Sequence, residues 1–111
     1  MKKPIEVALT DEAKAFVANQ LPNVRKKMAT AFEKTEAGHQ GDWFKKLPDT
    51  EELWEFRVDG PNHTYRLFAF WDNRGLTETL IVCTHGLDKK TQKTPKAELA
   101  KAARVRREYF S

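Results

Sequence analysis

Three strand-like segments joined by two short turns fill residues 52 to 84, and this succession restricts the fold more than any other feature of the chain. In residues 52 to 58 apolar side chains alternate with polar ones, as they do in a strand with one buried face. Residues 64 to 71 are almost continuously apolar, which indicates a central strand buried on both faces. Residues 77 to 84 form the next strand. Because both connections are short, the sequence predicts an antiparallel meander of at least three strands.

The N-terminal part of the chain changes its period from strand to helix. Residues 4 to 9 alternate like a short strand, and Thr10 is a suitable N-cap for a helix that continues to Leu21. A second helix is expected from about Asn23 to Ala37, ended by Gly38. The two amphipathic helices are expected to pair as a hairpin.

A last helix is expected to begin at Thr94 and Pro95, residue types that suit an N-cap and a first helical position. The predicted order is therefore β-α-α-β-β-β-α. This order makes the fold class α+β, with a twisted antiparallel sheet, an N-terminal helix hairpin and a C-terminal helix. A length of 111 residues suits a single domain over residues 1–111.

Positive charge is concentrated in the C-terminal quarter of the chain. Residues 85 to 111 carry eight Lys or Arg against three acids, a net charge of +5, whereas residues 1 to 84 carry twelve against thirteen, a net charge of −1. A local excess of positive charge is typical of proteins that bind a polyanion such as nucleic acid. The alternative is that a basic amphipathic helix presents only a solvated face.

Several classes of function lack their usual motifs in this sequence. The three histidines are isolated and there is no C-x-x-C or H-E-x-x-H motif, so no metal site is expected. Glycine-rich phosphate loops are absent, so no cofactor is expected either. No apolar run is long enough to span a membrane, and the single cysteine, Cys83, suits a buried thiol in a reducing compartment. We therefore expect a cytoplasmic protein that works without a membrane or a cofactor.

The second half of the chain contains three sequence blocks in a recognisable order. They are Leu-Trp-Glu-Phe-Arg-Val-Asp at 53 to 59, Thr-Tyr-Arg-Leu-Phe-Ala-Phe at 64 to 70, and His-Gly-Leu-Asp-Lys-Lys-Thr-Gln-Lys-Thr-Pro at 85 to 95. These blocks closely resemble the phage-related HigB-like branch of the RelE/ParE toxin superfamily. The resemblance implies a ribosome-dependent endoribonuclease that cuts mRNA in the ribosomal A site. It also implies a cognate antitoxin, usually with a helix-turn-helix DNA-binding domain, through which alone the toxin would reach operator DNA.

Cleavage of RNA without a metal ion uses the 2′-OH as nucleophile, and it requires a base, an acid and cations that stabilise the charge of the phosphorane. Arg57 and Arg66 lie on consecutive strands near their shared turn, so both guanidinium groups are expected at one phosphate if they face the same side. The alternative for each arginine is an ion pair with an acid such as Glu55. His85, expected at the end of the last strand, is a candidate base or acid, or else a side chain hydrogen bonded to a loop backbone.

The resemblance adds further candidates from the C-terminal part of the chain. The predicted catalytic set is Arg57, Arg66, His85, Lys89, Lys90 and Tyr109. The basic residues predicted to bind RNA are Lys93, Lys96, Lys101, Arg104 and Arg107. The alternatives are that the loop lysines are merely solvated and that Tyr109 anchors the last helix to the core. RelE toxins carry lysines on the strand of Leu53 and Glu55, and this chain does not, so its catalytic set is expected to differ from theirs.

Two other functions are compatible with the sequence. A ParE-like member of the same superfamily would bind DNA gyrase without cutting RNA, and its basic C-terminal helix would form an interface or face DNA. An inactive phage-derived binding module would have neither activity. For the RNA-cleaving toxin, Arg66→Ala is expected to abolish growth inhibition and leave the fold intact, unless Arg66 closes a buried ion pair.

Overall fold

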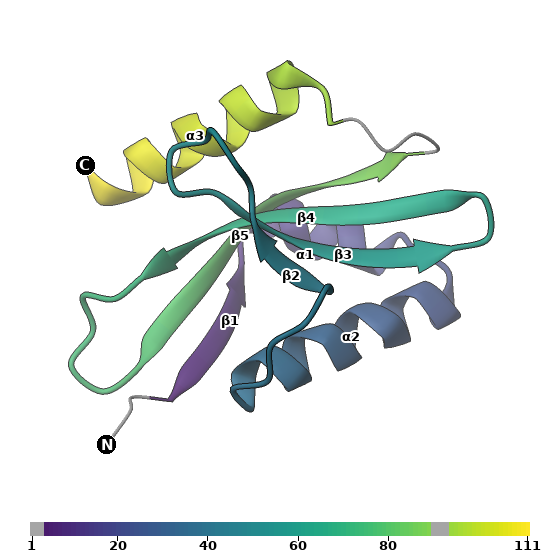
Figure 1. Cartoon of the computed structure of the whole chain (residues 1–111), viewed down its shortest axis with the longest axis horizontal. Helices are drawn as coiled ribbons and strands as arrows, with labels where there is room; N and C mark the ends of the chain where they lie inside the picture. Colours follow the sequence, from purple (N-terminus) through teal and green to yellow (C-terminus); the bar gives the residue numbers. More distant parts are fainter. Residues whose placement is uncertain (1–3, 90–93) are drawn as a thin grey trace.

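The computed structural model describes residues 4–89 and 94–111, which form a five-stranded sheet with helices on both faces (Figure 1). The elements follow the order β1 (Ile5–Leu9), α1 (Asp11–Ala18), α2 (Pro22–Glu36), β2 (Phe44–Lys46), β3 (Trp54–Gly60), β4 (His63–Asp72), β5 (Thr79–Lys89) and α3 (Lys96–Phe110). Helices α1 and α2 cover one face of the sheet, and α3 lies on the other (Figure 1). The predicted fold class, α+β, is confirmed.

The sheet is mixed rather than antiparallel. Its strand order is β1-β5-β4-β3-β2, in which β1 runs parallel to β5 and all other neighbours are antiparallel. The predicted meander is confirmed for β3, β4 and β5, but the expectation of a fully antiparallel sheet is wrong. Parallel neighbours require a long connection, which the chain between β1 and β5 provides, and no local pattern in residues 4 to 9 indicates that pairing.

The strands differ from the predicted ones most at β2 and β5. β2 was not predicted, because a strand of three residues is too short for an alternating pattern to be visible. β5 ends at Lys89 instead of residue 84, because its last residues pair with the first half of β4. A polar segment that contains a glycine looks like a loop in the sequence. Here the long neighbouring strand β4 satisfies its backbone hydrogen bonds.

A β-bulge at Thr84 determines on which face of the sheet each side chain in the second half of β5 lies. Phe68 pairs with His85 and Ala69 pairs with Cys83, so Thr84 is an extra residue in the ladder. Side chains alternate along a regular strand, and Cys83 and His85 would therefore share a face without the bulge. With the bulge, Cys83 faces the core under α1 and α2, whereas His85 contacts α3.

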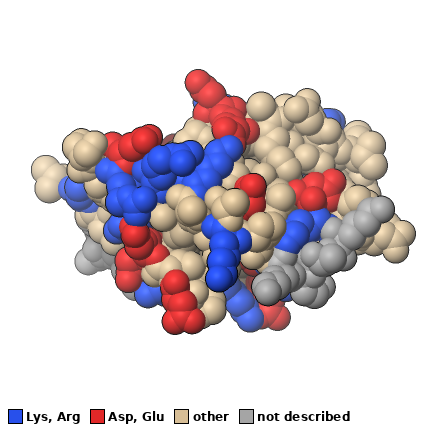
Figure 2. All heavy atoms as spheres, turned by 90° about the horizontal axis from the view of Figure 1, so that it is seen from above, with Lys and Arg blue, Asp and Glu red and all other residues tan. Residues whose placement is uncertain are grey.

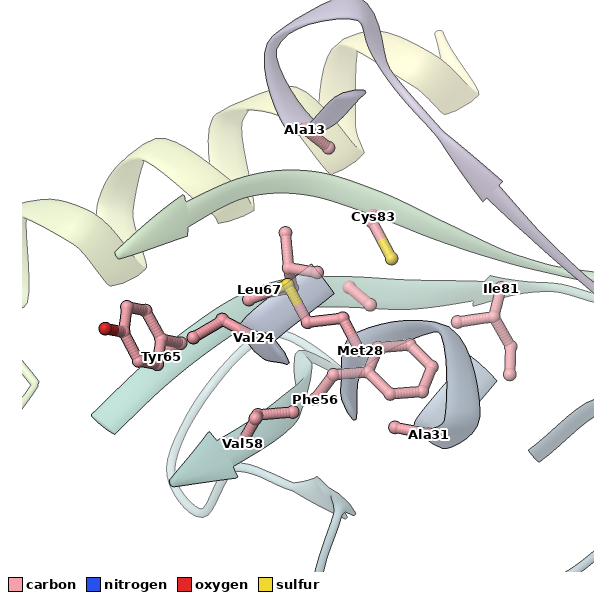
Figure 3. Close-up of a cluster of buried hydrophobic side chains, with 11 residues drawn as sticks. Ala13, Val24, Met28, Ala31, Phe56, Val58, Tyr65, Leu67, Ile81 and Cys83 are labelled. Carbon is pink, nitrogen blue, oxygen red and sulfur yellow. The ribbon is translucent and has the colours of Figure 1, made fainter. Parts of the chain in front are cut away.

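Each face of the sheet has its own apolar core. Val24, Met28 and Ala31 of α2 point toward Phe56 and Leu67 of the sheet (Figure 3). Their spacing is the helical apolar stripe that the sequence predicts. The core under α3 consists of Leu53, Phe68, Ala102 and Ala103, with Leu47, Leu87 and Leu99 packed against it.

Cys83 belongs to the first core, and the predicted buried thiol is confirmed. Burial raises the pKa of the Cys83 thiol, which keeps it protonated near neutral pH. A protonated thiol in an apolar core is a packing residue, because the thiolate is the reactive form of cysteine.

Two of the predicted helix-end signals are confirmed, but the first helix ends at Ala18 and does not continue to Leu21. The Oγ1 of Thr10 accepts a hydrogen bond from the backbone N–H of Ala13 at 3.1 Å, as an N-cap does. Gly38 follows α2 with a φ of 87°, a conformation that favours glycine. The predicted start of the last helix is wrong by one residue. Pro95 is the N-cap and not the first helical residue, because its ψ of 140° is extended.

Candidate functional site

The face of the sheet that carries α3 also carries the two predicted arginines. The register places Arg57 directly opposite Arg66, so their side chains lie on the same face, as the sequence prediction requires. On β5, Leu87 lies opposite Arg66, and Lys89, two residues further, lies opposite Thr64. Because side chains on one face recur at every second residue, Arg57, Arg66 and Lys89 share this face.

Arg66 is buried in an ion pair with Glu55. Its Nη1 donates to both carboxylate oxygens of Glu55, at 2.9 and 3.1 Å. The side chains of Arg66 and Glu55 are only 6% and 8% exposed. The sequence offered two interpretations of Arg66, a phosphate-binding side chain or an ion pair with an acid such as Glu55. The structure shows the ion pair. In this geometry Arg66 does not meet a substrate directly, and its removal would leave an uncompensated buried charge.

Arg57 is the accessible arginine of the two. Its side chain is 36% exposed, and its Nε lies 3.6 Å from Oδ1 of Asp59. The guanidinium lines a groove of about 400 Å³ whose lining residues are Asp42, Trp43, Lys45, Glu55, Arg57 and Asp59. We call this surface the arginine groove. A planar guanidinium in such a groove can bind two oxygens of one phosphate.

His85 lies inside β5 and not at its end, where the sequence predicts it. The side chain is 2% exposed, and its ring packs 5.0 Å from the ring of Phe68. Its Nε2 lies 2.8 Å from Oε2 of Glu98 on α3, and its Nδ1 lies 3.0 Å from Oγ1 of Thr84. Both ring nitrogens are thus engaged. His85 ties α3 to the sheet and does not face the arginine groove.

The burial of His85 should make the stability of the protein depend on pH. Burial lowers the pKa of His85 below its ordinary value of 6.5 and Lys101 adds to this effect, whereas Glu98 and Glu12 oppose it. The unfolded chain therefore binds a proton at a higher pH than the folded one. The contribution of His85 to the free energy of unfolding is fully present above about pH 6.5 and decreases as the pH falls through the lowered pKa.

Urea unfolding across this pH range measures the effect of His85. In His85→Gln we expect a smaller decrease of stability below about pH 6.5 than in the wild type, because Gln does not titrate. His39→Gln, at an exposed histidine after α2, is the control and should keep the wild-type dependence. Identical pH profiles for His85→Gln and the wild type would contradict the lowered pKa.

Two of the predicted RNA-binding residues on α3 are in ion pairs with other parts of the chain. Lys101 pairs with Glu12 of α1 at 2.5 Å, and Arg107 pairs with Glu51 before β3 at 2.6 Å. Figure 2 shows the molecule from the side of α3, with acidic side chains among the basic ones. Part of the positive charge of α3 is therefore used to attach the helix.

The other basic candidates of the C-terminal part lie on α3, at the end of β5 or outside the described residues. Lys96 and Arg104 are exposed on α3. Lys90 and Lys93 lie outside the described residues. The sequence predicts Lys89 in a loop. It is instead the last residue of β5, because the strand is longer than expected.

Tyr109 lies far from the arginine groove. Its hydroxyl donates to Oδ2 of Asp72 at 2.7 Å, and Asp72 is six residues beyond Arg66 on β4, roughly 20 Å along an extended strand. Hydrogen bonds from Arg74 and then Tyr109 lower the pKa of Asp72, so its carboxylate stays ionised and holds the end of α3. The structure thus separates Tyr109 from the other candidates and gives it the anchoring position.

The residues on the outer side of the arginine groove were not predicted from the sequence. Lys45 lies on β2 opposite Glu55 and pairs with Asp42 at 2.9 Å. Trp43 precedes this strand, and its carbonyl accepts a hydrogen bond from the N–H of Arg57 at 2.8 Å. The signal in the sequence was the closeness of Trp43 and Lys45, residue types that can stack on a base and contact a phosphate.

The described parts of the chain contain neither a cluster of potential metal ligands nor a membrane-spanning helix. Within residues 4–89 and 94–111, no three His, Cys, Asp or Glu side chains are grouped so that they could hold a metal ion. None of the helices in these ranges is both long and apolar enough to cross a lipid bilayer.

Comparison with known proteins connects this arrangement with a family. The curated proteins contain no match to the chain. The model of the family described as phage-derived protein Gp49-like (DUF891) matches residues 15–107. The match begins in α1 and ends in α3, and it includes every residue of the arginine groove. The chain therefore belongs to the Gp49-like family of phage-derived proteins, a RelE/toxin-like family whose members are often toxins of toxin-antitoxin systems.

Proposed function

We propose that the chain is a toxin of the HigB type, which stops translation by cleaving mRNA on the ribosome. The observation that carries the proposal is the position of Arg57 in a member of a toxin-like family. Arg57 is an accessible guanidinium on the sheet face that it shares with Arg66 and Lys89. Such a cation suits the phosphate of an RNA strand, whose cleavage needs stabilisation of negative charge.

The proposed reaction is an attack of the ribose 2′-OH on the adjacent phosphorus. The bond from phosphorus to the 5′ oxygen of the next nucleotide breaks, which leaves a 2′,3′-cyclic phosphate and a 5′-OH. A base takes the proton of the 2′-OH and an acid gives one to the leaving oxygen. Arg57 stabilises the charge on the non-bridging oxygens, and the carboxylate of Asp59, 70% exposed beside it, can take up the proton.

The buried pair of Arg66 and Glu55 has a positioning role in this proposal. It joins β3 to β4 at residues close to Arg57, and it thereby holds the strand that carries the accessible guanidinium. Proton transfer by His85 stays a prediction, and it would require α3 to move away from the sheet, since the side chain is 2% exposed and Glu98 of α3 engages its Nε2.

The proposed partners are the ribosome with its mRNA and a cognate antitoxin that covers the toxin. A toxin with a net charge of +4 would otherwise bind RNA without selection at low salt. The antitoxin, and not this chain, would contact operator DNA. A stable monomer that binds no product of a neighbouring gene would count against this part of the proposal.

Induced expression followed by pulse labelling tests the proposed function in cells. Incorporation of amino acids into protein should stop before incorporation of thymidine into DNA, because the proposed target is mRNA on the ribosome. Loss of DNA synthesis first would favour a ParE-like action on gyrase. Normal growth and normal labelling with folded protein present would indicate an inactive binding module.

A further inference from the structure

A second groove lies between α2 and β3, next to the arginine groove. It has a volume of about 500 Å³, and Lys26, Lys27, Lys34, Trp43, Val58 and Asp59 are among the residues that line it. We call this surface the lysine groove. Its volume is within the range of about 300–1,000 Å³ that is common for ligand-binding pockets.

The lysines of this groove come from one stripe of α2. The polar residues that the helix contributes recur at helical spacing: Asn23, Lys26, Lys27, Thr30 and Lys34. The stripe runs beside the apolar stripe that packs on the sheet. The two acids of α2, Glu33 and Glu36, do not line the groove. The helix therefore presents positive charge toward β3 although its own composition is mixed.

The three lysines of the groove can still bind an anion. In the part of the chain that the structure describes, none of them forms an ion pair with an acid. Lys27 donates one hydrogen bond to the main-chain oxygen of Asp59 at 2.9 Å, and the Nζ of Lys34 lies 4.7 Å from the centroid of the Trp43 ring. An ammonium group has three donors, so these contacts leave capacity for an anion. Lys101 and Arg107 of α3 differ, because each is paired with a carboxylate.

The lysine groove and the arginine groove meet at the edge of β3. The β2 ladder ends at Phe56, and beyond the hydrogen bond between Arg57 and Trp43 the strand has no neighbour on that side among the described strands. Trp43 and Asp59 line both grooves. One extended ligand can therefore lie at Arg57 and continue around this edge toward α2.

We propose that the lysine groove binds the sugar-phosphate backbone of single-stranded RNA beside the nucleotide held at Arg57, an inference that rests on the proposed function. The lysines contact phosphates, and Trp43 and Val58 provide an apolar surface for a ribose or base. From Lys27 to Lys34 the helix rises about 10 Å, so the lysines reach different phosphates of one strand. Continuity with Arg57 favours RNA over an acidic protein segment as the occupant.

Binding of a short, fluorescently labelled single-stranded RNA at a series of salt concentrations tests the inference. The 2′-OH groups of this RNA are methylated so that it cannot be cleaved by its own hydroxyls. For Lys26→Ala/Lys27→Ala we expect the slope of log K against log salt to decrease by about 1.4, because each lost phosphate contact contributes about 0.7 for a single strand. A decrease of about 1.4 in the slope corresponds to roughly 25-fold weaker binding at 0.1 M salt. Lys14→Glu, an exposed position on α1 with the same change of net charge, should keep the wild-type slope.

Several results would overturn the inference. They are a wild-type slope and affinity in Lys26→Ala/Lys27→Ala, no RNA binding by the wild type, or binding of a poly-glutamate peptide in place of RNA. Urea unfolding confirms that the double variant is folded. Lys26→Ala alone, which retains the hydrogen bond of Lys27, provides a second variant with an expected decrease of about 0.7 in the slope.

The same proteins added to translating ribosomes separate this inference from the proposed function. If the wild type leaves ribosome-bound mRNA intact but binds RNA through the lysines, the proposed function fails and the lysine groove stands as an RNA site. If the wild type cleaves mRNA and the double variant cleaves it at the same protein concentrations, the lysine groove fails and the proposed function stands. Support for both requires that the double variant needs a higher concentration but reaches the same maximal rate.

Discussion

Arg66→Ala is expected to lower the free energy of unfolding by about 3–5 kcal/mol, because it leaves the carboxylate of Glu55 buried without its counter-ion. A domain of this size has a total stability of about 5–15 kcal/mol, so the loss removes a large part of it. Urea unfolding followed by circular dichroism measures the difference. A loss of growth inhibition in this variant would then follow from its lowered stability and not from chemistry, which corrects the expectation from the sequence that Arg66→Ala leaves the fold intact.

The double variant Arg66→Met/Glu55→Leu is the matched control. It removes both charges and fills their volume with apolar groups, a replacement that is often neutral for stability. We expect it to recover most of the stability lost in Arg66→Ala. An Arg66→Ala protein within about 1 kcal/mol of the wild type would show that the ion pair is not what holds β3 and β4 at this point.

Arg57→Ala is expected to reduce the rate of mRNA cleavage about 100-fold to 1,000-fold while the fold stays intact. Removal of one preorganised group that stabilises the charge of a transition state typically costs this much. Stability should change by about 1 kcal/mol or less, since the ion pair that Arg57 forms with Asp59 lies at the surface. Single-turnover cleavage on ribosomes, with excess toxin, measures the rate.

Lys14→Ala and Arg57→Lys serve as controls for this variant. Lys14 is exposed on α1 and does not line the arginine groove or the lysine groove, so its removal should leave the rate unchanged. Arg57→Lys keeps the charge but loses the two-point geometry of guanidinium, and an intermediate rate is expected. A folded Arg57→Ala protein with the wild-type rate would remove Arg57 from the site.

The sequence was sufficient for the elements whose signals are local. The apolar alternation of residues 52 to 58 and the apolar run of residues 64 to 71 correspond to β3 and β4, and Thr10 caps α1 as predicted. Whether Arg57 and Arg66 face the same side stayed open in the sequence, and it is the register of the β3–β4 hairpin that places them on one face. These features depend on neighbours within a few residues along the chain or across one hairpin.

The features of the fold and the site that the sequence did not predict depend on contacts between distant segments. The bulge at Thr84 reverses the face of the following residues, and it alone puts His85 under α3. The burial of Arg66 depends on Glu55, which the sequence offers only as one of several acids. In the sequence the lysines of α2 look like an exposed polar stripe. Only the position of β3 beside them shows that they line a groove. Net charge along the chain pointed to α3, whereas ion pairs in the fold compensate part of that charge.

Primer extension on mRNA after the purified chain is added to translating ribosomes is the most direct test of the proposed toxin function. Ribosome-free mRNA and the folded Arg57→Ala protein are run in parallel. We expect new ends that carry a 5′-OH on ribosome-bound mRNA with the wild type, few such ends with Arg57→Ala, and none on free mRNA. Intact ribosome-bound mRNA in the presence of folded wild-type protein would contradict the assignment of this chain as a ribosome-dependent endoribonuclease.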